Sequence, residues 1–153
     1  MTGFGAASLL RYAAVFVAVA LGVGWAAAQV SGGAVEGVAA SIQLMVPAVI
    51  AALIEGGLFA KRHTRRHRFG EAWGFALATT VIATGLNLAI AYGAAGIAPE
   101  FGKLAIAPTM SQQFITLLGV YALGYLLCNR FFFGLGVGNQ LNLIARQNRD
   151  ESV

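Results

Sequence analysis

The chain has 153 residues, of which 58% are hydrophobic and only 10% are charged, and its formal net charge is +4. A soluble domain of this size keeps too large a fraction of its surface in water to hide so many apolar side chains. The composition therefore excludes a soluble globular protein and indicates a single integral membrane domain over residues 1–153. Loop placement in a membrane protein explains the basic excess, so no nucleic-acid partner is expected.

Four apolar segments are long enough to cross a bilayer, which takes about 20 mainly apolar residues per helix. Backbone groups in hydrocarbon must pair within their own segment, so each run is expected to be an α-helix. The predicted spans cover residues 12–28, 35–60, 72–92 and 113–133. The fold class is therefore all-α, a polytopic membrane protein with four transmembrane helices in an antiparallel bundle.

The first span, residues 12–28, permits two interpretations. Arg11, the apolar run after it and the small residues Ala26 to Ala28 also match the pattern of a cleavable signal peptide. A retained transmembrane helix is the favoured interpretation, and cleavage within residues 1–28 is the alternative.

Small residues recur every four positions in the first and third predicted spans. Such stripes let helix backbones approach closely in lipid. Packing inside the four-helix bundle is the favoured interpretation, and contact with another protein or with a second copy is the alternative. The stripes consist of Ala14, Ala18, Gly22 and Ala26 in the first span, and of Gly85, Ala89 and Gly93 in the third.

Gln43, Pro47 and Glu55 interrupt the second span. Proline kinks a helix, and ionisable residues inside spans are functional candidates by default. Gln43 and Glu55 therefore form a candidate coupling site beside the Pro47 kink. However, Arg62 lies seven residues after Glu55, on the same helix face and close to the inner interface. A structural ion pair or a snorkelled position for Glu55, and a packing role for Pro47, are the favoured interpretations.

Half of the basic residues lie in one loop, residues 61–71, between the second and third spans. Together with Arg11 and three arginines at or after the end of the fourth span, they put nine of ten basic residues on one side. This bias predicts a cytoplasmic loop, two cytoplasmic termini and a periplasmic loop over residues 93–112. The cations that we expect to contact anionic lipid headgroups or a partner are Lys61, Arg62, Arg65, Arg66 and Arg68.

His63, His67 and Glu71 are spaced by four residues and would share one face of a continuous helix. Histidines at this spacing can bind zinc. The five neighbouring cations oppose a divalent ion, and Gly70 weakens the helix that would align Glu71. A solvated basic loop is therefore favoured over a metal site, with Glu71 at the positive end of the third helix. No metal or other cofactor is expected.

The two ends of the fourth span carry different signals. Ser111 is placed to cap the start of the helix by accepting from its first free amides. Gly134, Gly136 and Gly138 are expected to end the helix and to lead into a cytoplasmic tail over residues 134–153. No strand precedes these glycines, so they do not form a nucleotide-binding loop.

The basic loop and the entry into the third span, "RFGEAWGFALATT" from Arg68 to Thr80, resemble small four-helix inner-membrane proteins of proteobacteria, a group without an assigned activity. The resemblance implies a fold and a bacterial inner-membrane location, and no activity. Small multidrug transporters also have four spans, but they need a glutamate in the first span, and this first span has no acidic residue.

We therefore expect a non-catalytic protein: an accessory or assembly subunit, or a homo-oligomeric membrane component. Its expected partners are membrane lipids and another membrane protein or itself. The alternative is a small proton- or cation-coupled transporter or channel that uses Glu55, Gln43 and the Pro47 kink.

Overall fold

The computed structural model describes residues 4–29, 36–93 and 108–151, with side chains described throughout these ranges except at residues 27–29 and 36–43. Within these ranges the chain is all-helical and has no strand. The helices are α1 (Ala6–Gln29), α2 (Glu36–His63), α3 (Phe69–Gly93) and α4 (Gln112–Asp150). All four are long and apolar enough to cross a membrane. The prediction of an all-α chain with four helices of this kind is confirmed.

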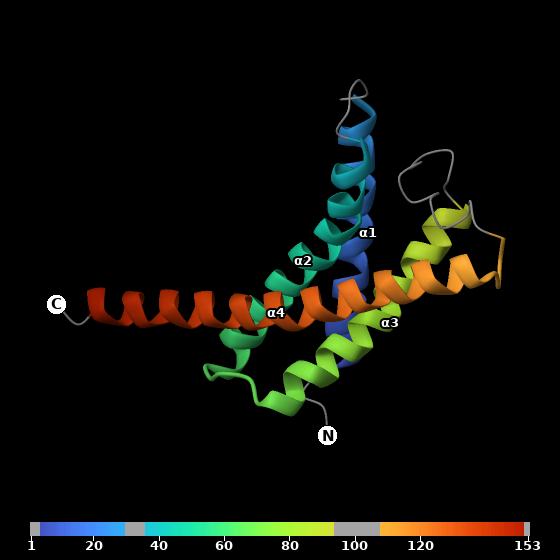
Figure 1. Cartoon of the computed structure of the whole chain (residues 1–153). Coiled ribbons are helices and arrows are strands. Elements are labelled where there is room, and N and C mark those ends of the chain that lie inside the picture. Colours follow the sequence, from blue (N-terminus) through green and yellow to red (C-terminus); the bar gives the residue numbers. More distant parts are fainter. Residues whose placement is uncertain (1–3, 30–35, 94–107, 152–153) are drawn as a thin grey trace.

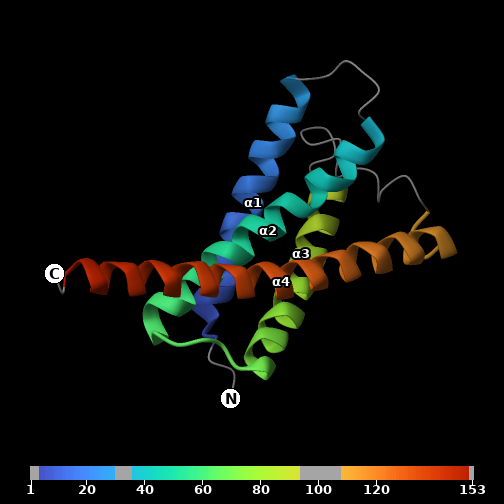
Figure 2. The ribbon, with the colours of Figure 1, turned by 60° about the vertical axis from the view of Figure 1, so that its left-hand side comes forward.

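The helices are arranged so that α4 lies across the other three. Figures 1 and 2 show α1 and α2 side by side and running in opposite directions, while the C-terminal part of α4 projects beyond them. The α4 helix packs against α2 and α3, and α1 packs against α2 and α3. The start of α1 and the loop between α2 and α3 lie at the same end of the molecule (Figure 1).

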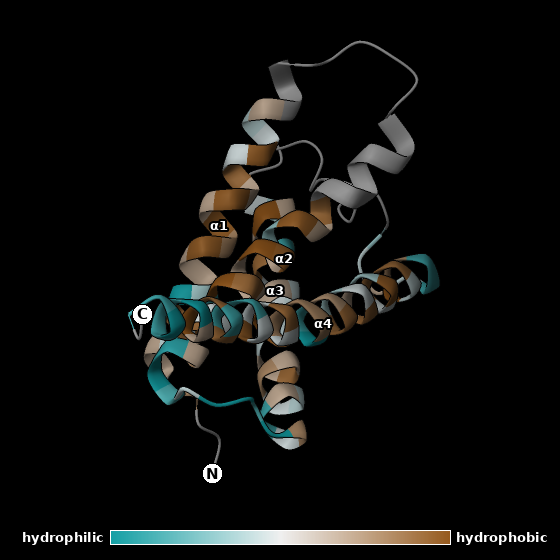
Figure 3. Cartoon of the chain, turned by 90° about the vertical axis from the view of Figure 1, so that its left-hand side faces the viewer, coloured by the Kyte–Doolittle hydropathy of each residue, from teal (hydrophilic) through white to brown (hydrophobic). Residues whose placement is uncertain are grey.

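Polar residues are concentrated at two places on this helical assembly. Figure 3 shows hydrophilic residues on the loop after α2 and on the C-terminal part of α4, while apolar residues dominate α1 and the described parts of α2 and α3. This distribution separates an apolar body, suited to hydrocarbon, from polar ends suited to water.

The fourth helix is much longer than its predicted span. The prediction that Gly134, Gly136 and Gly138 end this helix is wrong, because α4 runs through them to Asp150 and has 39 residues. At about 1.5 Å per residue it is roughly 58 Å long, about twice the hydrocarbon thickness of a bilayer. The polar residues after residue 134 are therefore a helical extension. The predicted N-cap is confirmed: the Ser111 hydroxyl accepts from the amide of Phe114 at 3.1 Å.

Two glycines explain why α4 stays helical there. A Cβ atom on Gly136 would lie 2.3 Å from the carbonyl oxygen of Leu53, and one on Gly56 would lie 2.2 Å from that of Phe133. Both distances are too short for any side chain, so only glycine fits at this crossing of α2 and α4. Contact between the two backbones offsets the helix-weakening effect of glycine.

Aromatic side chains from three helices fill the centre of the assembly. Tyr12 and Phe16 come from α1, Phe75 from α3, and Tyr125 and Phe133 from α4, and all are fully buried. The rings of Phe75 and Phe133 are stacked with their centroids 4.4 Å apart. Offset aromatic pairs of this kind add to the stabilisation from buried area. This core holds α1 and α3 in place against α4.

Candidate functional site

Among the described residues, Glu55 is the most deeply buried charged side chain, with 2% of its surface exposed. It lies on α2 and is held by Arg11 of α1. The Arg11 Nε donates to one carboxylate oxygen, and Nη2 donates to the other at 2.7 Å. Two parallel charge-assisted bonds of this type are strong and directional. They compensate much of the cost of moving the carboxylate out of water.

Ser8 completes this arrangement, because its hydroxyl also donates to Glu55. Ser8 and Arg11 are three residues apart on α1, so they share the helix face that meets α2. We call Ser8, Arg11 and Glu55 the polar junction. A small cavity of about 30 Å³ adjoins it, and Arg62 and His63 are among the residues that line the cavity. That volume is enough for about one water molecule.

The polar junction changes the interpretation of Glu55. The predicted ion pair exists, but its partner is Arg11 and not Arg62, which only borders the adjoining cavity. Both carboxylate oxygens of Glu55 accept hydrogen bonds from side chains of α1. Pro47 is buried inside α2. The side chain of Gln43, the other half of the candidate coupling site, lies outside the described residues.

Directly after Arg11 on α1, Tyr12 makes a second polar contact across the core. The hydroxyl of the buried Tyr12 donates to Asn129 Oδ1 of α4 at 2.8 Å. Hydrogen bonds between helices stabilise association in a membrane by about 0.6 kcal/mol on average. The α1 helix therefore forms polar contacts with α2 through the polar junction and with α4 through Tyr12.

The basic loop (residues 61–71) is organised around Glu71. Arg65 donates to both Glu71 oxygens, at 2.8 and 3.0 Å, and the amide of Arg68 donates to the same carboxylate at 2.7 Å. The hydrogen bond to Glu71 raises the pKa of Arg65 from its ordinary value, while burial acts in the opposite direction. Glu71 thus caps α3 and holds the loop folded, as its position at the helix start predicts.

The cations predicted to contact lipids differ in whether they form an ion pair within the protein. Lys61, Arg62, Arg66 and Arg68 are exposed, and Arg65 is the one member of the set that forms an ion pair with a described residue. Arg65 also lies over the ring of Phe59, with 5.4 Å from its guanidinium carbon to the ring centroid. Arg65 is therefore part of the loop structure, and the other four remain available for headgroups.

The two histidines and Glu71 of the candidate metal site have separate surroundings. His63 Nδ1 lies 3.1 Å from the carbonyl oxygen of Phe59, and the His67 ring packs on Phe133. Glu71 is engaged by Arg65. Among the described residues, no group of three or more His, Cys, Asp or Glu side chains is placed to hold a metal ion.

Arg130 on α4 is a further cation that borders the basic loop. Its guanidinium carbon lies 5.7 Å from the ring centroid of Phe69 and 5.8 Å from that of Trp73. Its Nε atom is buried and has no hydrogen-bond partner among the described residues. Cation–π contacts therefore hold this charge at the start of α3.

The small-residue stripes of α1 and α3 both face outward. Every member is exposed in the described structure, and the shared orientation follows from the spacing of four residues: Ala14, Ala18, Gly22 and Ala26 on α1, and Gly85, Ala89 and Gly93 on α3. Added Cβ atoms at Gly22, Gly85 and Gly93 would meet nothing within 4 Å. The expectation that these stripes pack inside the bundle is therefore wrong.

Sequence reasoning missed Ser8, Arg11, Tyr12 and Asn129 as parts of a buried polar network. Asn129 carried a usable signal, because an amide inside an apolar span requires a hydrogen-bond partner. No sequence signal links Ser8 and Arg11 to Glu55. Both residues lie more than 40 positions away from it in the chain, and only the fold brings them into contact.

Comparison with protein-family models finds no match, and comparisons with curated proteins and with solved structures find no significant match.

Proposed function

We propose that this chain is a non-catalytic integral membrane protein that acts through association: an accessory or assembly subunit of a membrane complex, or a homo-oligomeric component. The observation that carries the proposal is the outward orientation of both small-residue stripes. Stripes of this kind are typical of surfaces on which transmembrane helices meet. A helix of another protein, or of a second copy, would bury them.

The stripes occupy part of a larger exposed surface. On α3, Leu77 and Val81 continue the line of the stripe and are 55% and 74% exposed. On α1, Trp25 is 69% exposed beside Ala26. Large side chains beside small ones provide both contact area and the space for a close backbone approach. These surfaces suit helix partners better than lipid alone.

The proposed location is the bacterial inner membrane, with both termini in the cytoplasm. The support is that nine of ten basic residues fall on one side of the four spans predicted from the sequence, as positive-inside orientation requires. Reporter fusions after Arg65 and after Val153 should both report a cytoplasmic location. A periplasmic signal at Arg65 would contradict the topology.

The polar junction argues against the coupled transporter or channel. A coupling carboxylate must bind and release a cation or proton during each cycle. Glu55 instead forms a bidentate pair with Arg11 and accepts from Ser8. Its neutralisation by residues of the same chain suits a structural role, so Glu55→Gln should impair stability and leave no specific transport defect.

The association can be tested by purifying the protein in mild detergent and measuring the mass of the complex. Gly22, Gly85 and Gly119 are matched positions, because an added Cβ atom would meet nothing within 4 Å at any of them. Gly22→Leu and Gly85→Leu should each reduce the amount of dimer or of co-purified partner. Gly119→Leu, on α4 and outside the stripes, should leave it unchanged. A wild-type protein that is monomeric and free of companions would refute the proposal.

A further inference from the structure

The α2 and α4 helices form the walls of an open groove that the polar junction and the stripes do not use. It has a volume of about 450 Å³, and its walls belong to the C-terminal half of α2 and to α4 beyond the glycine crossing. Binding sites for small ligands have volumes of about 300–1,000 Å³. The lining residues are Leu53, Ile54, Gly57, Leu58, Lys61, Gly136, Asn139, Gln140 and Leu143.

The groove lies beside the closest approach of α2 and α4. Their backbones meet at Gly56 and Gly136, and α4 then crosses away from α2 (Figure 2). Gly57 leaves the floor open, since a Cβ atom there would be 4.0 Å from the nearest atoms of α4. The close crossing at Gly56 and Gly136 and the open space at Gly57 both depend on glycine at these positions.

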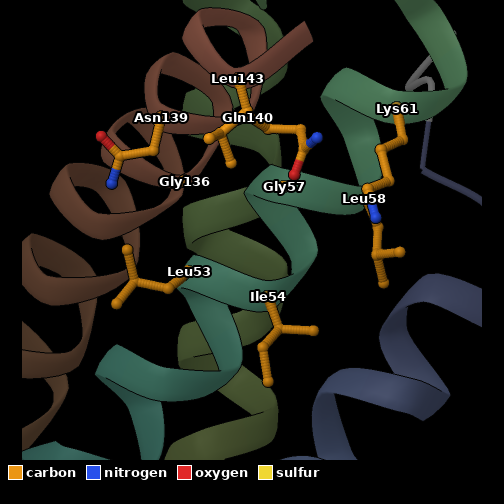
Figure 4. A pocket seen from close by; sticks show the side chains of 9 residues that line it. All are labelled: Leu53, Ile54, Gly57, Leu58, Lys61, Gly136, Asn139, Gln140 and Leu143. Atoms are coloured by element: carbon orange, nitrogen blue, oxygen red, sulfur yellow. The ribbon is translucent and has the colours of Figure 1, made fainter. Parts of the chain in front are cut away.

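The two ends of the groove differ in chemistry. Figure 4 shows Leu53 and Ile54 at one end, and Lys61, Asn139 and Gln140 towards the other, with Gln140 extending towards α2. Lys61 is exposed and forms no ion pair with a described residue. The groove is therefore apolar at one end and carries a cation and two amides, together with Leu143, at the other.

We infer that this groove binds one phospholipid with an anionic headgroup. The inference rests on the proposed membrane location. The apolar end belongs to the hydrophobic stretch of α2, and Lys61 is where that stretch meets the basic loop. None of the described residues that line the groove has a carboxylate. A phosphate at Lys61, with acyl chains over Ile54 and Leu53, matches the charge and the polarity at both ends.

A specific site differs from general attraction to the basic loop, because it depends on shape as well as on charge. Lys61→Gln removes the cation of the groove, while Arg66→Gln removes an exposed cation that does not line it. Gly57→Leu fills the groove without changing any charge, and Gly57→Ala is its control because there is room for one methyl group.

The experiment is native mass spectrometry of the protein released from bilayers of phosphatidylglycerol and phosphatidylcholine. One retained phosphatidylglycerol is expected on the wild type. Lys61→Gln should reduce its retention about fivefold, which corresponds to about 1 kcal/mol per basic side chain near a membrane surface. Gly57→Leu should reduce retention at least as much, while Arg66→Gln and Gly57→Ala should retain the lipid.

Several results would overturn the inference. If Lys61→Gln and Arg66→Gln reduced phosphatidylglycerol retention equally, the lipid would be attracted by the basic loop as a whole. If Gly57→Leu still retained phosphatidylglycerol, the lipid would bind outside the groove. Equal retention of phosphatidylcholine would remove the role of headgroup charge. Displacement by inorganic phosphate would identify a site for free anions, and a second copy lost on Gly57→Leu would identify a protein interface. The same spectra report dimers and companions separately, so failure of the lipid site is distinct from failure of the proposed association.

Discussion

Two arginine–glutamate pairs at the same end of this protein show how much the surroundings decide what an ion pair does. In the polar junction, Glu55 is 2% exposed and its partner Arg11 is 31% exposed. In the basic loop, Glu71 is 17% exposed and Arg65 is 44% exposed. Both pairs are bidentate, so the difference lies in access to water.

The buried pair connects two helices that are distant in sequence, whereas the exposed pair closes a loop within six residues. Loss of one partner from a buried pair leaves a charge with little compensation. Loss of one partner from an exposed pair leaves a charge that water and salt can screen. We therefore expect the polar junction to control helix assembly and the basic loop to depend only weakly on its ion pair.

The largest effect should come from removing the positive charge of the polar junction. Arg11→Met leaves the Glu55 carboxylate buried without its cation and should lower the free energy of unfolding by about 3–5 kcal/mol. The double variant Arg11→Met/Glu55→Met should recover much of that loss, because no isolated charge remains. Unfolding in mixed micelles would measure both, and a loss below about 1 kcal/mol for the single variant would contradict a structural role.

The neighbouring glycine should give the next largest effect. In Gly56→Ala the added Cβ would meet the carbonyl oxygen of Phe133 at 2.2 Å, so α2 and α4 must move apart. Overpacking of this kind costs about 1–3 kcal/mol. Gly57→Ala should be close to neutral, because its nearest neighbours are 4.0 Å away. Equal effects at the two positions would refute the backbone crossing.

A smaller effect is expected for the uncharged contact beside the polar junction. Tyr12→Phe removes the hydroxyl that donates to Asn129 and keeps the buried ring. The loss should be about 1 kcal/mol, in the range of single hydrogen bonds between membrane helices. The same unfolding assay applies. A loss as large as that of Arg11→Met would show that charge is not what distinguishes the polar junction.

The smallest effect should come from the exposed pair. Arg65→Gln removes two hydrogen bonds to Glu71, but the amide of Arg68 continues to donate to the same carboxylate. The loss in free energy of unfolding should be smaller than for the three preceding variants. It should vanish at about 1 M salt, where the screening length is about 3 Å. A large effect that persists at high salt would remove the contrast between the two pairs.

The number and type of the helices could be predicted from the sequence because long apolar runs in a membrane have few structural options. The extent of α4 could not. Gly134, Gly136 and Gly138 resemble a helix end locally, and the contact that favours the helix at Gly136 is made with Leu53, more than 80 residues away. Local glycine content gives no information about such a contact.

The candidate site, too, could be predicted only in part from the sequence. The burial of Glu55 in an ion pair was predictable from its position in an apolar span, but helix spacing pointed to Arg62, and the true partner is on α1. The orientation of the small-residue stripes was not predictable either. Spacing shows that these residues share a face, but it does not show whether that face is covered.

Cysteine cross-linking in native membranes tests the central claim, that the α1 and α3 stripes are surfaces for association. The chain has one cysteine, Cys128, so Cys128→Ser provides the background. In that background Ala18→Cys, in the α1 stripe, should give a cross-linked dimer or a cross-link to a second protein. Leu123→Cys, at a 57% exposed position on α4, should give neither. Equal labelling of both positions by lipid-soluble reagents, with no protein cross-link at Ala18, would contradict the account.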